Sequence, residues 1–441
     1  MHPERTARRM PRPVGFWLLS LALFVFLAAA SAPSPLYVVY QHRWGFSPTT
    51  LTTIFAVYAL ALLAALLIVG GLSDHVGRRP VLAAALIAEA AAMGLFLMAD
   101  GVGPLLLART LQGLATGAAA GAISAGLLDL QPTPTSPLGP LLNTVAPAAG
   151  LAAGALGAGL LVQYAPAPTT LVFALLTAAF IALAAVVPFL PETVSRRPGV
   201  WASLRPRAVV PPQARRTFLA TAPCFVAAWA MGGLYLSLGP SLAVGVLHIG
   251  SHLVGGLAVT TLFGAAAIAS VLVYDLPPQR VMGAGSVALA AGTGLTLLAL
   301  AGPSPLLFFL GTALSGLGFG TSFLGAFRSL AALTGPSQRA ELLASAYIVS
   351  YLALSVPAVL AGLAVPSLGL RATTTYYGAV VIVLALLAAV SAVVVRNPAA
   401  SRPAPGRLAP AVLSRSETPE HAPDQEAAQT PEPGPGSGTG A

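Results

Sequence analysis

Two ionisable side chains and one amide lie inside long apolar segments. Arg109 and Gln112 stand three residues apart in the apolar run from Leu105 to Gly113, and Glu89 lies within another apolar run. A charged side chain in a membrane interior rarely faces lipid and by default marks a functional site. Arg109 and Glu89 therefore suggest proton chemistry, in which a carboxyl binds or releases a proton under the influence of a guanidinium.

A purely structural role is an alternative for each of these residues. Arg109 lies five residues after Pro104, so its side chain could reach the surface at the helix end. Glu89 could remain protonated and hydrogen-bonded between helices. We expect Cys224 to be an inert core residue. We expect no metal site and no cofactor, since the histidines of the loops have no other metal-ligating residues near them in sequence. These histidines are His42, His248 and His252.

Composition indicates which elements must position these residues. The chain has 441 residues, of which 56% are hydrophobic and 8% are charged, and its mean hydropathy is +0.83. A soluble globular protein carries about 25% charged residues, and a disordered chain could not leave so much apolar surface in water. Because one membrane helix takes about 20 apolar residues, composition predicts an all-α membrane protein with about a dozen transmembrane helices.

Apolar runs separated by helix breakers predict 12 transmembrane helices. The first run resembles a signal peptide, but Pro33 follows the apparent cleavage site and the run is long, so we expect a retained helix. The predicted helices span residues 15–40, 50–71, 80–99, 104–129, 138–163, 168–190, 217–240, 252–274, 281–301, 304–328, 341–364 and 373–395.

The polar segments between these runs predict the domain organisation. The expected parts are a cytoplasmic tail over 1–13, a six-helix bundle over 14–190, a cytoplasmic central loop over 191–216, a second six-helix bundle over 217–395 and a cytoplasmic tail over 396–441. The last segment is rich in Pro, Ala, Gly and Ser, so we expect it to be disordered.

The distribution of arginine along the chain predicts its orientation in the membrane. All 22 basic residues are Arg, and 19 of them lie on cytoplasmic segments if the N-terminus is inside. This distribution follows the positive-inside rule and accounts for the net charge of +9 without a nucleic-acid partner. We expect a multi-pass protein of the plasma (inner) membrane with both termini in the cytoplasm.

The two halves of the chain repeat each other's motifs. Three matches recur in the same order, with offsets of 203, 210 and 201 residues. Such a series at nearly constant offset indicates a duplicated six-helix unit. The matches are Gly113-Leu114-x-x-Gly117 with Gly316-Leu317-x-x-Gly320, Pro147 with Pro357, and Asp74 with Asp275.

The loop after the second predicted helix carries the most specific motif. It reads Gly70-Gly71-Leu72-Ser73-Asp74-His75-Val76-Gly77-Arg78-Arg79-Pro80. Glycine permits close helix approach and a positive φ in a tight turn, and Asp74 and Arg78 can pair with neighbouring helix ends. A positively charged loop with turn residues would explain the same composition.

This loop resembles the signature G-x-L-A-D-x-x-G-R-R/K of the major facilitator superfamily. The resemblance covers about residues 14–396, including Pro191-Glu192-Thr193 at the end of the sixth helix. It implies two pseudo-symmetric six-helix halves and secondary transport, and the chain looks most like 12-span drug/proton antiporters. The matching positions are Gly70, Leu72, Asp74, Gly77, Arg78 and Arg79; Ser73 replaces Ala, and His75 stands where many members have Arg.

The resemblance also implies a conformational latch. It implies that Asp74 meets the N-terminus of the eleventh helix, between Ser337 and Glu341, and that Arg78 pairs with an acid ending the fourth helix, here Asp129. In the second half, the corresponding loop runs from Asp275 to Arg280 and the tenth helix ends in Arg328, so we infer a direct Asp275–Arg328 pair.

Two further motifs resemble superfamily signatures. The R-x-x-Q-G sequence resembles the fourth-helix signature, whose arginine serves proton coupling, so Arg109, Gln112 and Glu89 are our coupling candidates. Pro147, Gly150 and Gly154 match the G-P-x-x-G signature of proton antiporters that export drugs, although Ala146 replaces its first glycine. A kinked, small-residue packing surface would explain the same three residues.

Aromatic residues are candidates for a substrate cavity, although such residues also anchor helices at the membrane interface. Pro33 and Pro35 should interrupt the first helix and free backbone carbonyls. The cavity candidates are Tyr37, Tyr58, Trp229, Tyr235, Tyr347 and Tyr351.

We therefore predict a monomeric secondary transporter in the lipid bilayer that exports a small organic or drug-like molecule in exchange for protons. A proton-coupled uptake symporter for a sugar or metabolite is an alternative. A polytopic membrane enzyme is an alternative of another class, as is a signalling or structural membrane protein. The sequence shows no convergent catalytic groups at one membrane face and no nucleotide-binding loop.

Overall fold

The computed structural model describes residues 10–133, 136–206, 208–245, 251–333 and 336–394. Most of the predicted N-terminal tail, the predicted tail over 396–441, and His248 lie outside these ranges. The elements of the first half are α1 (Arg12–Ser31), α2 (Pro33–Trp44), α3 (Pro48–Val69), α4 (Ser73–Val76), α5 (Arg78–Leu97), α6 (Val102–Leu130), α7 (Leu138–Tyr164), α8 (Pro168–Val186) and η1 (Val187–Phe189).

Two short helices, α9 (Val200–Ser203) and η2 (Pro212–Ala214), lie in the central segment. The elements of the second half are α10 (Arg215–Ser237), α11 (Gly239–Gly245), α12 (His252–Leu272), α13 (Pro278–Ala301), α14 (Pro305–Ala331), α15 (Pro336–Leu368) and α16 (Leu370–Val394). The 12 predicted transmembrane helices are confirmed, because 12 segments of the described chain are long and apolar enough to cross a membrane.

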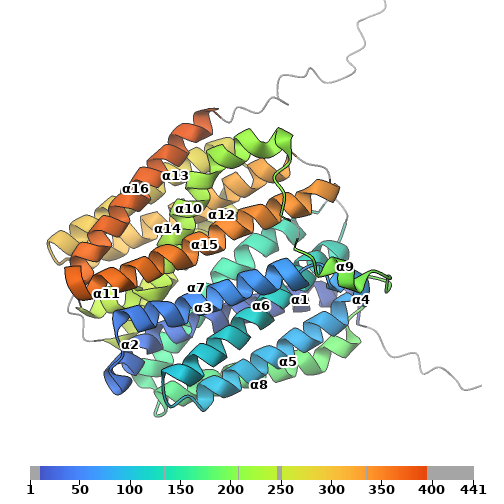
Figure 1. Ribbon diagram of the computed structural model, residues 1–441, viewed down its shortest axis with the longest axis horizontal. Coiled ribbons are helices and arrows are strands. Elements are labelled where there is room, and N and C mark those ends of the chain that lie inside the picture. Colours follow the sequence, from blue (N-terminus) through green and yellow to red (C-terminus); the bar gives the residue numbers. More distant parts are fainter. Residues whose placement is uncertain (1–9, 134–135, 207, 246–250, 334–335, 395–441) are drawn as a thin grey trace, which may run out of the picture. The chain divides into compact units, whose positions relative to one another are not determined.

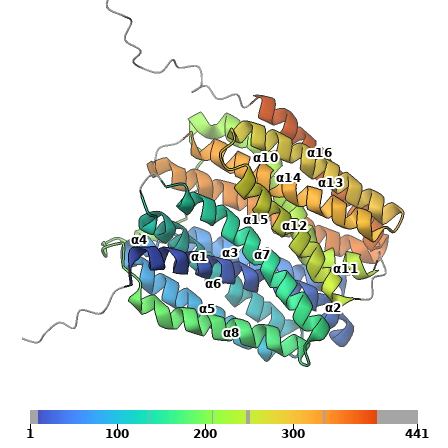
Figure 2. The same cartoon turned by 180° about the vertical axis from the view of Figure 1, so that it is seen from behind.

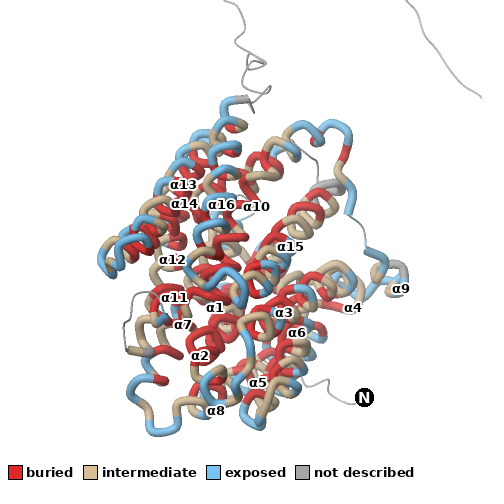
Figure 3. The backbone as a smooth tube through the Cα atoms, turned by 60° about the vertical axis from the view of Figure 1, so that its left-hand side comes forward, coloured by how far each residue is buried: buried red, intermediate tan, exposed pale blue. Residues whose placement is uncertain are grey.

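Apolar side chains cover both the inside and the outside of the helical part. Exposed large residues such as Ile87, Leu175 and Val390 alternate with buried ones along the helices, and Figure 3 shows this alternation as red and pale blue turns. Soluble proteins rarely expose so much contiguous apolar surface. The chain is therefore an all-α membrane protein whose outer helix faces contact lipid.

Local sequence explains where many of these helices begin and end. Proline occupies the first turn of α3, α8, α13 and α14, where its missing N–H leaves no helical hydrogen bond unmade. Ser47 and Ser304 cap α3 and α14 by accepting from the N–H groups of Thr50 and Leu307. Gly45 follows α2 with a φ of +65°, a left-handed conformation that favours glycine.

The helices form two halves that meet through α3 with α15 and α7 with α12. We call the end that carries α4 and α9 the linker end, and the end that carries α2 and α11 the opposite end. The halves lie close together at the opposite end and diverge toward the linker end (Figures 1 and 2). Hydrogen bonds between the halves lie from mid-bundle to the opposite end; they join Ser34 to Leu236, Thr49 to Gly362, Thr260 to Ala152 and Ser251 to Gln163.

The glycine repeat predicted from the sequence has the same packing role in both halves. A Cβ at Gly113 of α6 would overlap the carbonyl oxygen of Tyr58 in α3, and a Cβ at Gly316 of α14 would overlap that of Leu262 in α12. Tyr58 and Leu262 are 204 residues apart, close to the offset of the glycines themselves. Each half therefore uses an equivalent glycine to bring an equivalent pair of helices into backbone contact.

We predict that Gly113→Ala and Gly316→Ala each destabilise the protein by about 1–3 kcal/mol, because the new methyl group must push two helix backbones apart. Gly94→Ala is the matched control, since a Cβ there meets nothing within 4 Å, and alanine favours the helix by up to ~1 kcal/mol. Thermal unfolding in detergent measures the difference. Equal unfolding midpoints for Gly113→Ala and Gly94→Ala would contradict this packing.

Candidate functional site

Arg109 lies on α6 with its whole side chain buried, at 0% exposure. Its Nε and Nη2 donate hydrogen bonds to the Tyr37 hydroxyl at 2.7 and 2.5 Å. Its Nη1 donates to the Ala30 carbonyl at 3.0 Å and to Gln112 Oε1 at 2.7 Å. The guanidinium therefore joins α6 to α1 and α2, and the alternative in which Arg109 reaches the surface is wrong.

Proline supplies one of the acceptors for this network. Pro33 has no N–H, so the carbonyl of Ala29, four residues earlier, loses its helical donor. Gln112 Nε2 donates to this carbonyl at 3.0 Å, which confirms the expected release of a backbone acceptor. The helix is not sharply broken, because Ala32 between α1 and α2 keeps right-handed helical dihedral angles (φ −53°, ψ −36°).

Glu89 on α5 is also fully buried and joins the network through Gln112. Gln112 Nε2 donates to Glu89 Oε1 at 3.1 Å, and Thr116 Oγ1 donates to Glu89 Oε2 at 3.4 Å. Both amide hydrogens of Gln112 are thus used, on Glu89 and Ala29, while its oxygen accepts from Arg109. Gln112 separates the guanidinium from the carboxyl and links them through two consecutive hydrogen bonds.

Aromatic rings complete the surroundings of Arg109. Its Cζ lies 5.0 Å from the ring centre of Tyr58, 5.5 Å from that of Tyr37 and 6.0 Å from that of Phe96. A guanidinium is stabilised by aromatic faces when water is excluded. In the described part of the chain no carboxylate lies within 4.0 Å of Arg109, so the groups that stabilise its guanidinium directly are a hydroxyl, a carbonyl, an amide and aromatic rings.

Arg78 is the centre of a second polar cluster, at the linker end. Its guanidinium contacts the Asp74 carboxylate, donates to Ser73 Oγ at 2.6 Å, and places Nε 3.4 Å from Asp129 Oδ2. The contact with Asp129 is the pair that the sequence predicts. Gly77, just before Arg78, has a φ of +105°, which lets the loop turn directly into α5.

Glu192 is a member of this cluster that the sequence analysis did not single out. Its Oε1 accepts from the backbone N–H of Arg78 at 2.9 Å, and its Oε2 accepts from that of Arg79 at 3.1 Å. A carboxylate on the first N–H groups of a helix satisfies donors that have no helical partner. The Pro191-Glu192-Thr193 motif was the available indication, and Thr193 Oγ1 donates to Asp129 Oδ2 at 2.7 Å.

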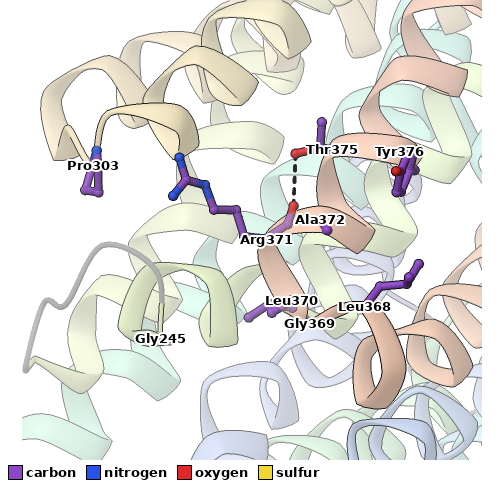
Figure 4. A pocket seen from close by; sticks show the side chains of 9 residues that line it. All are labelled: Gly245, Pro303, Leu368, Gly369, Leu370, Arg371, Ala372, Thr375 and Tyr376. Carbon is purple, nitrogen blue, oxygen red and sulfur yellow. Dashed lines mark hydrogen bonds between the residues drawn. The ribbon is translucent and has the colours of Figure 1, made fainter.

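A hollow of about 700 Å³ lies at the opposite end of the second half (Figure 4). In that view Arg371 extends across the hollow toward the helix turn beside Pro303, and its Nη2 donates to the Ala301 carbonyl. None of our predicted site residues lines this hollow. The residues that line it are Gly245, Pro303, Leu368, Gly369, Leu370, Arg371, Ala372, Thr375 and Tyr376.

The sequence profile of the Major Facilitator Superfamily matches residues 19–277. The chain belongs to this superfamily. It is therefore a transporter and not an enzyme, which confirms the prediction at that level.

Solved structures of superfamily transporters share this fold. The crystal structure of the human organic anion transporter MFSD10 (TETRAN) matches with a TM-score of 0.62 and 19% identity, over 86% of this chain and 100% of that one. A variant of the nucleoside transporter NupG matches with a TM-score of 0.66 and 14% identity, over 86% of this chain and 99% of that one. At these identities the similarity shows the fold alone. A comparison with curated proteins finds no match.

The contact of Asp74 with the start of the eleventh helix, which the resemblance implies, stays a prediction. Asp74 pairs with Arg78 of its own loop, and no hydrogen bond or ion pair in the described chain joins Asp74 to Glu341 at the start of α15. The Ser337 side chain lies outside the described residues. The halves diverge at the linker end, which carries α4 (Figures 1 and 2), and Asp74 belongs to α4.

The predicted Asp275–Arg328 ion pair is wrong. Arg328 Nη1 instead donates to the carbonyl groups of Tyr274 and Leu276, on either side of Asp275, and its Cζ lies 5.1 Å from the Tyr274 ring centre. Asp275 is exposed. Backbone carbonyls after the end of α12 lack helical donors and carry partial negative charge, so they can accept hydrogen bonds from the guanidinium.

Two of the predicted cavity tyrosines are sealed in the core, both at 0% exposure. The Tyr37 hydroxyl accepts hydrogen bonds from Arg109, and the Tyr235 hydroxyl is hydrogen-bonded to Thr312 Oγ1 at 2.6 Å. The other four candidates lie near the contact between the halves, on α3, α10 and α15; they are Tyr58, Trp229, Tyr347 and Tyr351.

The fifth-helix motif is a packing surface in this superfamily member. A Cβ at Gly150 would overlap the Phe24 carbonyl oxygen, and one at Gly154 would overlap that of Ala28. Pro147 lies within α7, one turn before Gly150. The motif therefore brings α7 against α1, the helix that carries the acceptors of Gln112 and Arg109.

We predict that Arg78→Asp and Asp129→Arg each impair transport and that the double reversal partly restores it. Recovery should be incomplete, because Arg78 also contacts Asp74 and Ser73, and Asp129 also accepts from Thr193. A double-mutant cycle on thermal unfolding should give a coupling free energy of about 1 kcal/mol for this partly exposed pair. A well-expressed double variant with no recovery and no coupling would contradict the pair.

Proposed function

We propose that this protein exports a small organic molecule in exchange for protons, with Glu89 as the proton-binding group. The observation that carries the proposal is the buried Arg109–Gln112–Glu89 network. A carboxyl and a guanidinium at 0% exposure are costly in a membrane protein. Such groups are retained where their charge performs a task, and proton binding is the chemistry that a buried carboxyl offers.

The contacts of Glu89 suit both of its protonation states. As a carboxylate it accepts from Gln112 Nε2 and Thr116 Oγ1. As a carboxylic acid it needs one acceptor, and a threonine hydroxyl can rotate to accept as well as donate. The proton can therefore be bound or released without breaking the bonds that Arg109 makes to Tyr37 and Ala30.

Gln112 supports a link between proton binding and helix movement. It holds the carboxyl of Glu89 on α5 and the carbonyl of Ala29 on α1 through the same nitrogen. A shift of α1 against α5 would alter both bonds together. A change in the charge of Glu89 would in turn favour one arrangement of these helices over the other.

The arrangement of the halves suits alternating access. They are hydrogen-bonded toward the opposite end and diverge at the linker end. With the linker end in the cytoplasm, as the arginine distribution favours, this is the state that receives a substrate from inside the cell. We propose that the other state closes the linker end, where Asp74 then meets the start of α15 near Glu341.

The remaining parts of the proposal follow from the same features. The match of Pro147, Gly150 and Gly154 to an exporter signature favours export over uptake. The coupling ion is the proton, the location is the plasma membrane with both termini inside, and the monomer is the working unit. The proposal is tested by measuring the uptake of a panel of uncharged, cationic and anionic compounds into inside-out proteoliposomes. Each compound is measured with and without an imposed pH gradient.

We predict that Arg109→Lys weakens gradient-driven transport but largely preserves substrate binding. Lysine keeps the charge yet lacks the planar fork that reaches Tyr37, Ala30 and Gln112 together. Arg109→Ala should abolish accumulation while permitting downhill exchange. Both variants are assayed in proteoliposomes at equal protein density.

Arg371→Ala is the matched control for the loss of an arginine, since Arg371 lies at the opposite end, far along the chain from the network. It should accumulate substrate normally. Normal pH-driven accumulation by Arg109→Ala would show that Arg109 has only a structural role.

A further inference from the structure

Five aromatic side chains of the second half form a closed cycle of ring contacts. The cycle runs from Trp229 to Phe323 at 5.6 Å, to Phe327 at 5.7 Å, to Tyr347 at 5.8 Å, to Tyr351 at 6.2 Å and back to Trp229 at 4.9 Å. We call this cluster the aromatic box. It is contributed by α10, α14 and α15, and all five residues are only half-buried.

The aromatic box contains a hydrogen-bond donor without a partner. Trp229 Nε1 is buried and makes no hydrogen bond within the described protein. An indole N–H can only donate, and a buried donor left unpaired is costly. The same condition holds for Ser350 Oγ, which lies between Tyr347 and Tyr351 on the same face of α15.

A third unpaired polar group, a hydroxyl, belongs to the first half. Tyr58 Oη on α3 is buried without a hydrogen-bond partner, and the Tyr58 side chain lies near that of Tyr351 across the contact between α3 and α15. The other side of Tyr58 meets Arg109, whose Cζ lies 5.0 Å from the ring centre. Tyr58 therefore lies between the aromatic box and the Arg109–Gln112–Glu89 network.

We propose that the aromatic box binds uncharged, planar aromatic molecules that carry a hydrogen-bond acceptor. The rings supply stacking and edge-to-face surfaces, and the acceptor takes the N–H of Trp229, with the O–H of Tyr58 as a second polar contact. An unpaired donor calls for an acceptor, which a simple cation lacks, and the positive charge of Arg109 behind Tyr58 disfavours a cationic ligand. This inference rests on the proposed export function and specifies its substrate class.

Equilibrium dialysis of the purified full-length protein in detergent, without a proton gradient, tests the site with four probes. Coumarin is planar, aromatic and uncharged and carries a carbonyl acceptor. Octahydrocoumarin keeps the acceptor without aromatic rings, naphthalene keeps the rings without an acceptor, and N-methylquinolinium adds a positive charge. We expect saturable binding to be tightest for coumarin and weaker for the other three.

Two variants remove the polar contacts and keep an aromatic ring at each position. Trp229→Phe and Tyr58→Phe should each weaken coumarin binding about fivefold, as expected for one net hydrogen bond, and leave naphthalene binding within about twofold. Unchanged naphthalene binding also shows that each variant is folded. Trp17→Phe, at an exposed position on α1, is the matched control and should bind all four probes as the wild type does.

Equal binding of coumarin and octahydrocoumarin, or the absence of saturable coumarin binding, would overturn the proposed aromatic site. Preference for N-methylquinolinium would overturn the uncharged class, and unchanged coumarin affinity in Trp229→Phe would overturn the role of the indole N–H. Because binding is measured without a gradient, a failure of proton-driven transport would overturn the proposed coupling and leave the aromatic site intact.

Discussion

A guanidinium buried in an apolar helix bundle must have its donors satisfied, and the first half of this protein is arranged around that requirement. Arg109 uses the hydroxyl of Tyr37, a carbonyl of α1 and the amide of Gln112. Proline in the first span frees a neighbouring carbonyl, which Gln112 then takes. The glycines of α6 and α7 bring α6 against α3 and α7 against α1, so the helices around the cation are packed closely. Sequence features that are far apart along the chain thus serve one buried cation.

The second half repeats the packing of the first half without its charge. The offset of 203 residues that relates Gly113 to Gly316 also relates Arg109 to Thr312 and Gln112 to Ser315. Thr312 pairs with Tyr235, so the second half keeps a tyrosine contact at the corresponding place with two neutral hydroxyls. Duplication therefore accounts for the repeated fold. The differences between the halves account for the different roles that we propose for them. The proposed proton site lies in the first half and the aromatic box in the second, with Tyr58 between them.

Local patterns predicted most of the fold, because apolar run length and helix breakers determine which segments can span a bilayer. The Arg78–Asp129 contact was also predictable, since the family resemblance implies an acid at the end of the fourth helix as the partner of the loop arginine. Glu192 was missed because its role depends on backbone N–H groups 113 and 114 residues away, which no spacing rule shows. The Asp275–Arg328 pair was wrong because sequence shows charged side chains but not the backbone carbonyls that compete for them. Whether Asp74 contacts the start of α15 near Glu341 depends on how the two halves are placed relative to each other. The sequence does not give that placement.

The account depends most directly on an exchangeable proton at Glu89, and infrared difference spectroscopy across a pH titration of the purified protein tests it. The wild type should show a carboxylic-acid band that disappears as the pH rises, and Glu89→Gln should lack that component. Gln112→Ala should keep the band but change the pH at which it disappears, because the link from the carboxyl to Arg109 is cut. A set of titrating bands that is identical in the wild type and in Glu89→Gln would contradict the account.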